Sequence, residues 1–169
     1  MKILKNTILA SLATAMSLAS FTVLADDDDW RAMQRSKLNA TQALIIATDK
    51  VAGQAVELSF DEDDGHAYYE IDIYSSNKKH ELRVDANSGK VVESEIDHER
   101  DSKVSVEVSL QQAMIIAERE TQAKTKNAEL KNRSDSDSYY EVETIRKNTE
   151  YEVKIDANSG EVLQIKRED

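Results

Sequence analysis

The sequence has 169 residues, with 33 Asp and Glu against 22 Lys and Arg, so its net charge at pH 7 is −11. An acidic chain of this kind is repelled by nucleic-acid backbones and by anionic lipid surfaces, which excludes both as expected partners. Cysteine is absent, so we expect neither a disulfide nor a lipid attached to an N-terminal Cys.

Residues 1–25 have the pattern of a secretory signal. Lys2 and Lys5 precede an uncharged apolar run over 8–24, and residues 23–25 (VLA) match the small-x-small cleavage pattern. A retained membrane anchor is the alternative, but the run is short, rich in Ala, Ser and Thr, and followed by an acidic cluster, which favours cleavage. We therefore expect a periplasmic or secreted protein with no stable membrane anchor.

An acidic and polar lead-in follows at residues 26–37 and carries the only tryptophan, Trp30. Cleavage after residue 25 removes two lysines, so the net charge of the mature chain moves from −11 to −13. Charge therefore favours basic protein surfaces or cations as partners.

The rest of the chain repeats itself. Three stretches occur twice, at an offset of 70 for the first and 71 for the others: QALIIA at 42–47 and QAMIIA at 112–117, YYE at 68–70 and 139–141, and DANSG at 85–89 and 156–160. A tandem duplication explains these matches. We place the first copy at 38–95 and the second at 108–169. Residues 96–107 are a predicted linker, because they are mostly polar and have no periodic apolar face.

Each copy is predicted to begin with an amphipathic helix, because apolar residues recur at three- and four-residue spacing, as at Ala43, Ile46 and Ala47. Capping boxes are expected at both helix starts, formed by the pairs Asn39 with Gln42 and Ser109 with Gln112. Gly53 is expected to close the first helix.

After each helix the apolar period changes to two, which predicts antiparallel strands. The first strand of the second copy, around 128–131, has the weakest pattern. The predicted fold class is α+β, with two repeats that each have one helix followed by an antiparallel β-meander of three to four strands. We expect one sheet face of each copy to lie under its helix and the two copies to pack as a pseudo-symmetric pair.

The helix pattern A-x-x-x-A at Ala43 and Ala113, the Tyr-Tyr-Glu strands and the strand ends VDANSGKV and IDANSGEV resemble the PepSY domain family. The resemblance covers residues 38–95 and 108–167. It implies a non-catalytic binding module, since PepSY domains occur in propeptides of secreted thermolysin-like metallopeptidases and in exported bacterial proteins, where a role in restraining proteases has been proposed. No peptidase domain follows Asp169, so we expect any inhibition to act in trans.

The DANSG segments are predicted to be structural turns. An Asp carboxylate can accept hydrogen bonds from main-chain N–H groups of a turn, while Gly takes the left-handed conformation. The predicted turn signature is Asp85, Asn87, Gly89, Asp156, Asn158 and Gly160. Calcium is the alternative, but an EF-hand loop needs Gly at position six and Glu at position twelve, and both segments lack them.

Other polar clusters predict no catalytic or metal site. Asp61–Asp64 together with Asp26–Asp29 could hold Ca²⁺ weakly, although a solvated acidic turn explains the first cluster. The three histidines fall in separate turns or the linker and are interpreted as surface residues: His66, His80 and His98. Hydrolase motifs are missing, so we expect no enzyme and no cofactor.

The paired tyrosines are interface candidates: Tyr68, Tyr69, Tyr139 and Tyr140. Neighbouring residues of a strand point to opposite faces, so one ring of each pair is expected in the core and the other outside. Our leading hypothesis is an exported, non-enzymatic tandem PepSY protein that binds another protein, such as a protease, through a sheet edge or an exposed sheet face. The alternative is an acidic envelope protein that binds divalent cations weakly.

Overall fold

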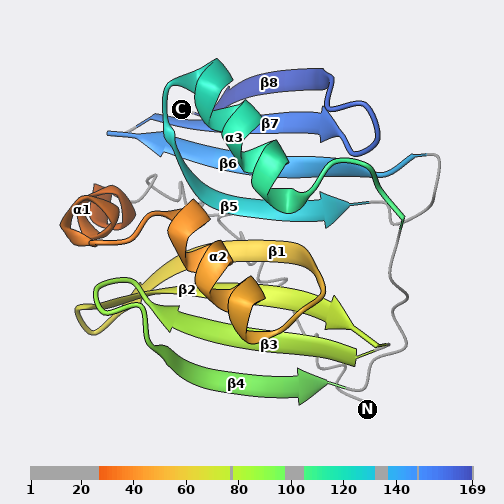
Figure 1. The fold of residues 1–169 in the computed structure, drawn as a ribbon. Helices are drawn as coiled ribbons and strands as arrows, with labels where there is room; N and C mark the ends of the chain where they lie inside the picture. Colours follow the sequence, from red (N-terminus) through yellow and green to blue (C-terminus); the bar gives the residue numbers. More distant parts are fainter. Residues whose placement is uncertain (1–26, 77, 98–104, 132–136, 148, 169) are drawn as a thin grey trace, which may run out of the picture.

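The computed structural model describes residues 27–76, 78–97, 105–131, 137–147 and 149–168 (Figure 1). The predicted signal peptide and the middle of the predicted linker lie outside these residues. Among the helices of the described part, none combines the length and apolar character needed to cross a lipid bilayer.

The first repeat contains one helix and four strands, preceded by a further helix. The elements are α1 (Asp27–Arg35), α2 (Ala40–Lys50), β1 (Gln54–Asp63), β2 (His66–Ser75), β3 (Lys78–Asp85) and β4 (Val91–Asp97). The second repeat has the same order: α3 (Leu110–Thr121), β5 (Lys124–Lys131), β6 (Tyr139–Arg146), β7 (Thr149–Asp156) and β8 (Val162–Glu168). The α+β fold class and the two helix-plus-meander repeats are therefore confirmed.

The two meanders join into one antiparallel sheet, with the strand order β4-β3-β2-β1-β5-β6-β7-β8. The seam between the repeats is the pair β1–β5, where Leu58 lies opposite Ala128. Both α2 and α3 cover the same face of this sheet, side by side (Figure 1). The repeats thus pair edge to edge around a pseudo-twofold axis. The helix of each repeat covers the half of the sheet that the same repeat forms.

The helix starts agree with their capping signals. Asn39 accepts a hydrogen bond from the main-chain N–H of Gln42, whose side chain accepts one from Asn39 in return. Ser109 and Gln112 form the same capping box at α3. These reciprocal bonds satisfy N–H groups that have no partner inside the helix.

The prediction for Gly53 is wrong. The C-cap of α2 is Val51 in an extended conformation, and Gly53 does not adopt a left-handed φ. A side chain at Gly53 would place its Cβ 2.4 Å from the main-chain oxygen of Tyr74. Glycine is required there because two backbones approach closely.

The lead-in, for which the sequence predicted only polar character, forms helix α1. Its Ala32 and Met33 side chains are buried against the sheet. Asp29 of α1 forms a 2.7 Å ion pair with Lys126 on β5, which also contacts Glu150. An amphipathic pattern over so few residues is hard to recognise when most of its neighbours are charged.

Candidate functional site

The candidate site is the open face of the sheet, meaning the face opposite α2 and α3. The strand register places polar side chains there in two rows that run across the strands. The acidic row consists of Glu81, Asp72, Glu57, Glu129, Glu141 and Lys154. The second row consists of Arg83, Glu70, Ser59, Asn127, Glu143 and Glu152.

The pseudo-twofold axis relates the two rows to each other, but related positions carry different side chains. Offsets of 70 or 71 relate Glu57 to Asn127 and Ser59 to Glu129, so the backbone positions are equivalent while the side chains differ. As a result, carboxylates occupy the centre of the acidic row, and uncharged side chains occupy the centre of the second row. The duplication has therefore left five carboxylates and one cation in the acidic row, against three carboxylates and one cation in the second row.

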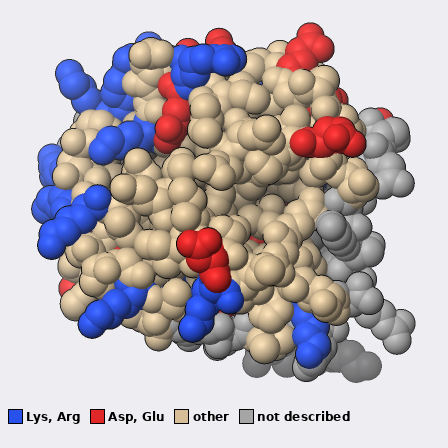
Figure 2. Space-filling model, viewed as in Figure 1, with Lys and Arg blue, Asp and Glu red and all other residues tan. Residues whose placement is uncertain are grey.

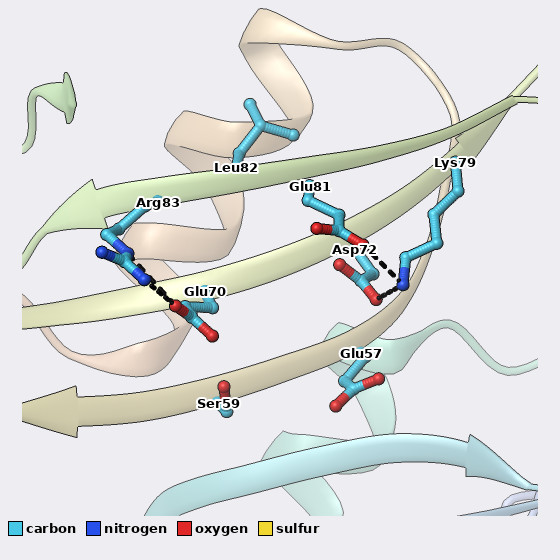
Figure 3. Close-up of a pocket in the computed structure, with 8 residues that line it drawn as sticks. All are labelled: Glu57, Ser59, Glu70, Asp72, Lys79, Glu81, Leu82 and Arg83. Atoms are coloured by element: carbon cyan, nitrogen blue, oxygen red, sulfur yellow. Dashed lines mark hydrogen bonds and ion pairs between the residues drawn. The ribbon is translucent and has the colours of Figure 1, made fainter. Parts of the chain in front are cut away.

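A pocket of about 430 Å³ lies over the first repeat on this face. Its floor is β1, β2 and β3, and its lining side chains include Glu57, Ser59 and Glu70 (Figure 3). Two cations are held within it. Lys79 forms ion pairs of 2.9 Å with Asp72 and 2.8 Å with Glu81, and Arg83 donates to Glu70.

Burial and nearby charge change the acidity of these groups. Burial raises the pKa of Glu57, and the neighbouring Asp72 and Glu129 carboxylates raise it further, against the lowering effect of Lys79 and Lys131. Burial alone would lower the pKa of Lys79, but hydrogen bonds to its two carboxylate partners outweigh this effect and raise it. The ionised form of Glu57 is therefore disfavoured.

The two tyrosines on the open face, Tyr68 and Tyr139, flank the two rows. Arg83 lies 4.2 Å from the centre of the Tyr68 ring, and Lys154 lies 5.6 Å from that of Tyr139. Each cation also contacts the glutamate two residues after its tyrosine, so the two repeats share a tyrosine, glutamate and cation cluster. Burial and a hydrogen bond to Asp61 raise the pKa of Tyr68.

The inner tyrosines do not belong to this surface. Tyr69 and Tyr140 are 1% and 0% exposed, and both lie in the core under the helices. Among the interface candidates of the sequence, Tyr69 and Tyr140 are thus corrected to core residues, because alternate residues of β2 and β6 face the helices. Tyr68 and Tyr139 are half-buried on the open face.

The DANSG segments form two matching turns. In the first, Asp85 Oδ1 accepts hydrogen bonds from the main-chain N–H groups of Asn87 and Ser88 at 3.2 and 2.6 Å, and Gly89 has a left-handed φ of 71°. The second turn repeats the arrangement with the residues Asp156, Asn158, Ser159 and Gly160. Hydrogen bonds from Ser88 lower the pKa of Asp85. Both aspartates use an oxygen within their own turn.

Acidic side chains at the turn between β1 and β2 also accept hydrogen bonds from residues nearby in the chain. Asp61 accepts from the Tyr68 hydroxyl at 3.0 Å, and Glu62 accepts from the main-chain N–H of Gly65 at 2.9 Å. Across the described residues, no group of three or more His, Cys, Asp and Glu side chains gathers in a way that could hold a metal ion. Of the histidines, His66 and His80 fall on β2 and β3, and His98 lies outside the described residues.

The two outer strands carry a feature that the sequence analysis missed. Four large apolar side chains are exposed on them: Val92 and Ile96 on β4, and Leu163 and Ile165 on β8. Each outer strand pairs with only one neighbour among the described strands. The alternation of apolar residues does not show which strands lie at the edges of a sheet. The exposure of these four side chains could therefore be recognised only once the strand order was known.

Comparison with known proteins agrees with the repeat. Residues 37–95 and 107–166 each match the family PepSY, described as peptidase propeptide and YPEB domain. The chain belongs to the PepSY family. The two matches coincide with the two helix-plus-meander units, so each unit of the single sheet is one PepSY domain.

Two solved structures match parts of this chain. A candidate lipoprotein from Clostridium difficile 630 has 26% sequence identity and a TM-score of 0.50, over 81% of this chain and 97% of its own. The YpeB C-terminal domain of Bacillus megaterium has 14% identity and a TM-score of 0.32, over 82% of this chain and 69% of its own. No curated protein sequence matches the chain.

Proposed function

We propose that this PepSY protein is an exported, non-catalytic binding module that restrains or regulates a secreted protease in trans. The family description, which includes peptidase propeptides, supports a propeptide-like role. The candidate lipoprotein from Clostridium difficile supports a location outside the cytoplasm, either periplasmic or secreted.

The observation that carries the proposal is the pair of outer strands. An edge strand presents unpaired N–H and C=O groups that can pair with an extended segment of another protein. Proteins that avoid such pairing place Lys or Pro on their edges. β8 does carry Lys166 and Arg167 near its end, but β4 and β8 also expose Val92, Ile96, Leu163 and Ile165, so apolar contacts would add to the main-chain hydrogen bonds. A protease segment in extended form is the matching partner.

The test is inhibition of secreted metallopeptidases of the source organism by the chain from residue 26 onwards. Val92→Lys and Leu163→Lys place a charge on β4 and β8 respectively, and we expect the double variant to weaken binding and inhibition at least tenfold. Inhibition constants from peptide-hydrolysis rates and dissociation constants from calorimetry measure the effect.

The matched control carries the same substitution on the helices. Ile45→Lys on α2 and Ile115→Lys on α3 also replace exposed apolar side chains, at 44% and 50% exposure against 59% for Val92 and 56% for Leu163. These variants should inhibit as the unmodified chain does. Equal loss in both double variants, or no binding of any secreted protease, would contradict the proposal. No observation on the described residues favours the cation-binding alternative.

A further inference from the structure

Two clefts lie between the repeats on the helix side, and the pseudo-twofold axis relates them. The first cleft is lined by Met33, Leu38, Asn39, Ala40, Tyr69, Glu118, Lys124 and Thr125. The second cleft is lined by Leu44, Thr48, Gly53, Gln54, Ala55, the segment 105–111 and Tyr140. Tyr140, Val108 and Gln54 of the second cleft are the counterparts of Tyr69, Leu38 and Lys124 of the first.

The two clefts differ greatly in volume. The first has about 10 Å³ of free space, and the second has about 330 Å³. The difference has a visible cause, since α1 lies on the first cleft and buries its Met33 side chain there to 4% exposure. A volume of 330 Å³ is within the range of pockets that bind ligands.

The sequence does not repeat the residues with which α1 fills its cleft. The positions 70 residues after Trp30, Ala32 and Met33 are occupied by Arg100, Ser102 and Lys103. The second repeat therefore has no counterpart of the apolar side chains of α1. Viewed from the helix side, the middle of the surface is largely uncharged, whereas Lys and Arg gather along the margin where α1 lies (Figure 2).

A second observation marks the same cleft. The side-chain oxygen of Gln54 is buried and has no hydrogen-bond partner within the described part of the chain. A buried acceptor without a donor destabilises the folded state.

We propose that the second cleft binds an amphipathic helix of the protein partner, which inserts a Met or Leu side chain where α1 inserts Met33 in the first cleft. We assign this occupant from the first cleft, where α1 already packs with its Met33 side chain inserted. The assignment deepens the proposed function, on which it rests, by adding a helix-binding subsite to the edge-strand contact. Helix-in-groove recognition of this kind depends on a few apolar anchors.

The experiment titrates the ¹⁵N-labelled chain from residue 26 onwards with a hydrocarbon-stapled helical peptide of residues 27–39. Stapling removes the helix-forming cost that would weaken a short peptide. We expect saturable chemical-shift changes at Leu44, Thr48, Gln54 and Val106. A peptide with Met33→Asp should bind at least tenfold more weakly, and one with Met33→Leu should bind about equally.

Three outcomes would overturn the proposal. The first is no saturable change at millimolar peptide. The second is a change confined to Tyr69 and Lys124, which would mean that the peptide only replaces α1 in the first cleft. The third is the same change produced by unlabelled chain without peptide, which would assign the cleft to a second copy. The peptide titration needs no protease and no edge strand, so its failure and the failure of protease inhibition are separate results.

Discussion

The hydroxyl of Tyr140 donates a 2.7 Å hydrogen bond to the main-chain oxygen of Val108, 32 residues earlier in the chain. Its counterpart Tyr69 makes the same bond to Leu38, but at 3.3 Å. Both rings are buried, and burial raises the pKa of Tyr140 to about 12. Each bond connects the residues just before the helix of a repeat to the second strand of the same repeat.

Tyr140→Phe should therefore destabilise the protein more than Tyr69→Phe. Removing the Tyr140 hydroxyl leaves the Val108 oxygen without its short bond, at a cost of about 1–3 kcal/mol for a buried acceptor. The longer Tyr69 bond is weaker, so its loss should cost about 1 kcal/mol or less. Urea unfolding of both variants measures the difference, and equal losses would show that the two repeats depend on these bonds to the same extent.

Gly53→Ala should destabilise the protein strongly, because the new Cβ would lie 2.4 Å from the main-chain oxygen of Tyr74 and 2.6 Å from a methyl group of Ile73. The cost should reach about 2 kcal/mol or more, since backbone must move. Gly65→Ala is the control, because its Cβ meets no atom within 4 Å and only the left-handed φ resists it. Thermal unfolding compares the two, and a smaller loss at position 53 would contradict the close approach.

The sequence predicted the repeat units well because their signals are local. Capping boxes at Asn39 and Ser109 and the alternation of apolar residues depend on neighbours a few positions away. The joining of both meanders at Leu58 and Ala128 depends instead on a pairing 70 positions apart, for which strand β5 gave only a weak pattern. The acidic row and the second cleft follow from that pairing, so they could not be predicted before it was known.

The turn aspartates should make stability dependent on acid pH. Hydrogen bonds from Ser88 hold the pKa of Asp85 below its ordinary value of 3.8, and those from Ser159 do the same for Asp156. A lowered pKa means that this stabilisation is present above pH 3.8 and is lost as the pH falls below it. We expect the double variant Asp85→Asn and Asp156→Asn to be less stable at pH 7.

That deficit should shrink as the pH is lowered towards 2, because the unmodified aspartates then become protonated too. Urea unfolding at successive pH values follows it. Asp49→Asn on the exposed side of α2 is the control and should follow the unmodified chain. A deficit that stays constant across the acid range would show that the carboxylate charge contributes nothing to the turns.

Glu57→Gln should stabilise the protein at pH 7. Glu57 lies directly opposite Glu129 on β5, and like charges in such positions are destabilising, so relief should yield about 0.2–1 kcal/mol. Because the pKa of Glu57 is raised in the folded state, its ionisation lowers stability as the pH rises above 4.5, and the gain should vanish at lower pH.

Glu161→Gln, in the exposed turn after β7, is the control and should change stability little. Unfolding curves at pH 7 and at pH 3 separate the two variants. A loss of stability in Glu57→Gln at pH 7 would show that the carboxylate has a partner that stabilises it. A gain would mean that the acidic row is present at a cost to folding, which is expected of side chains that serve binding.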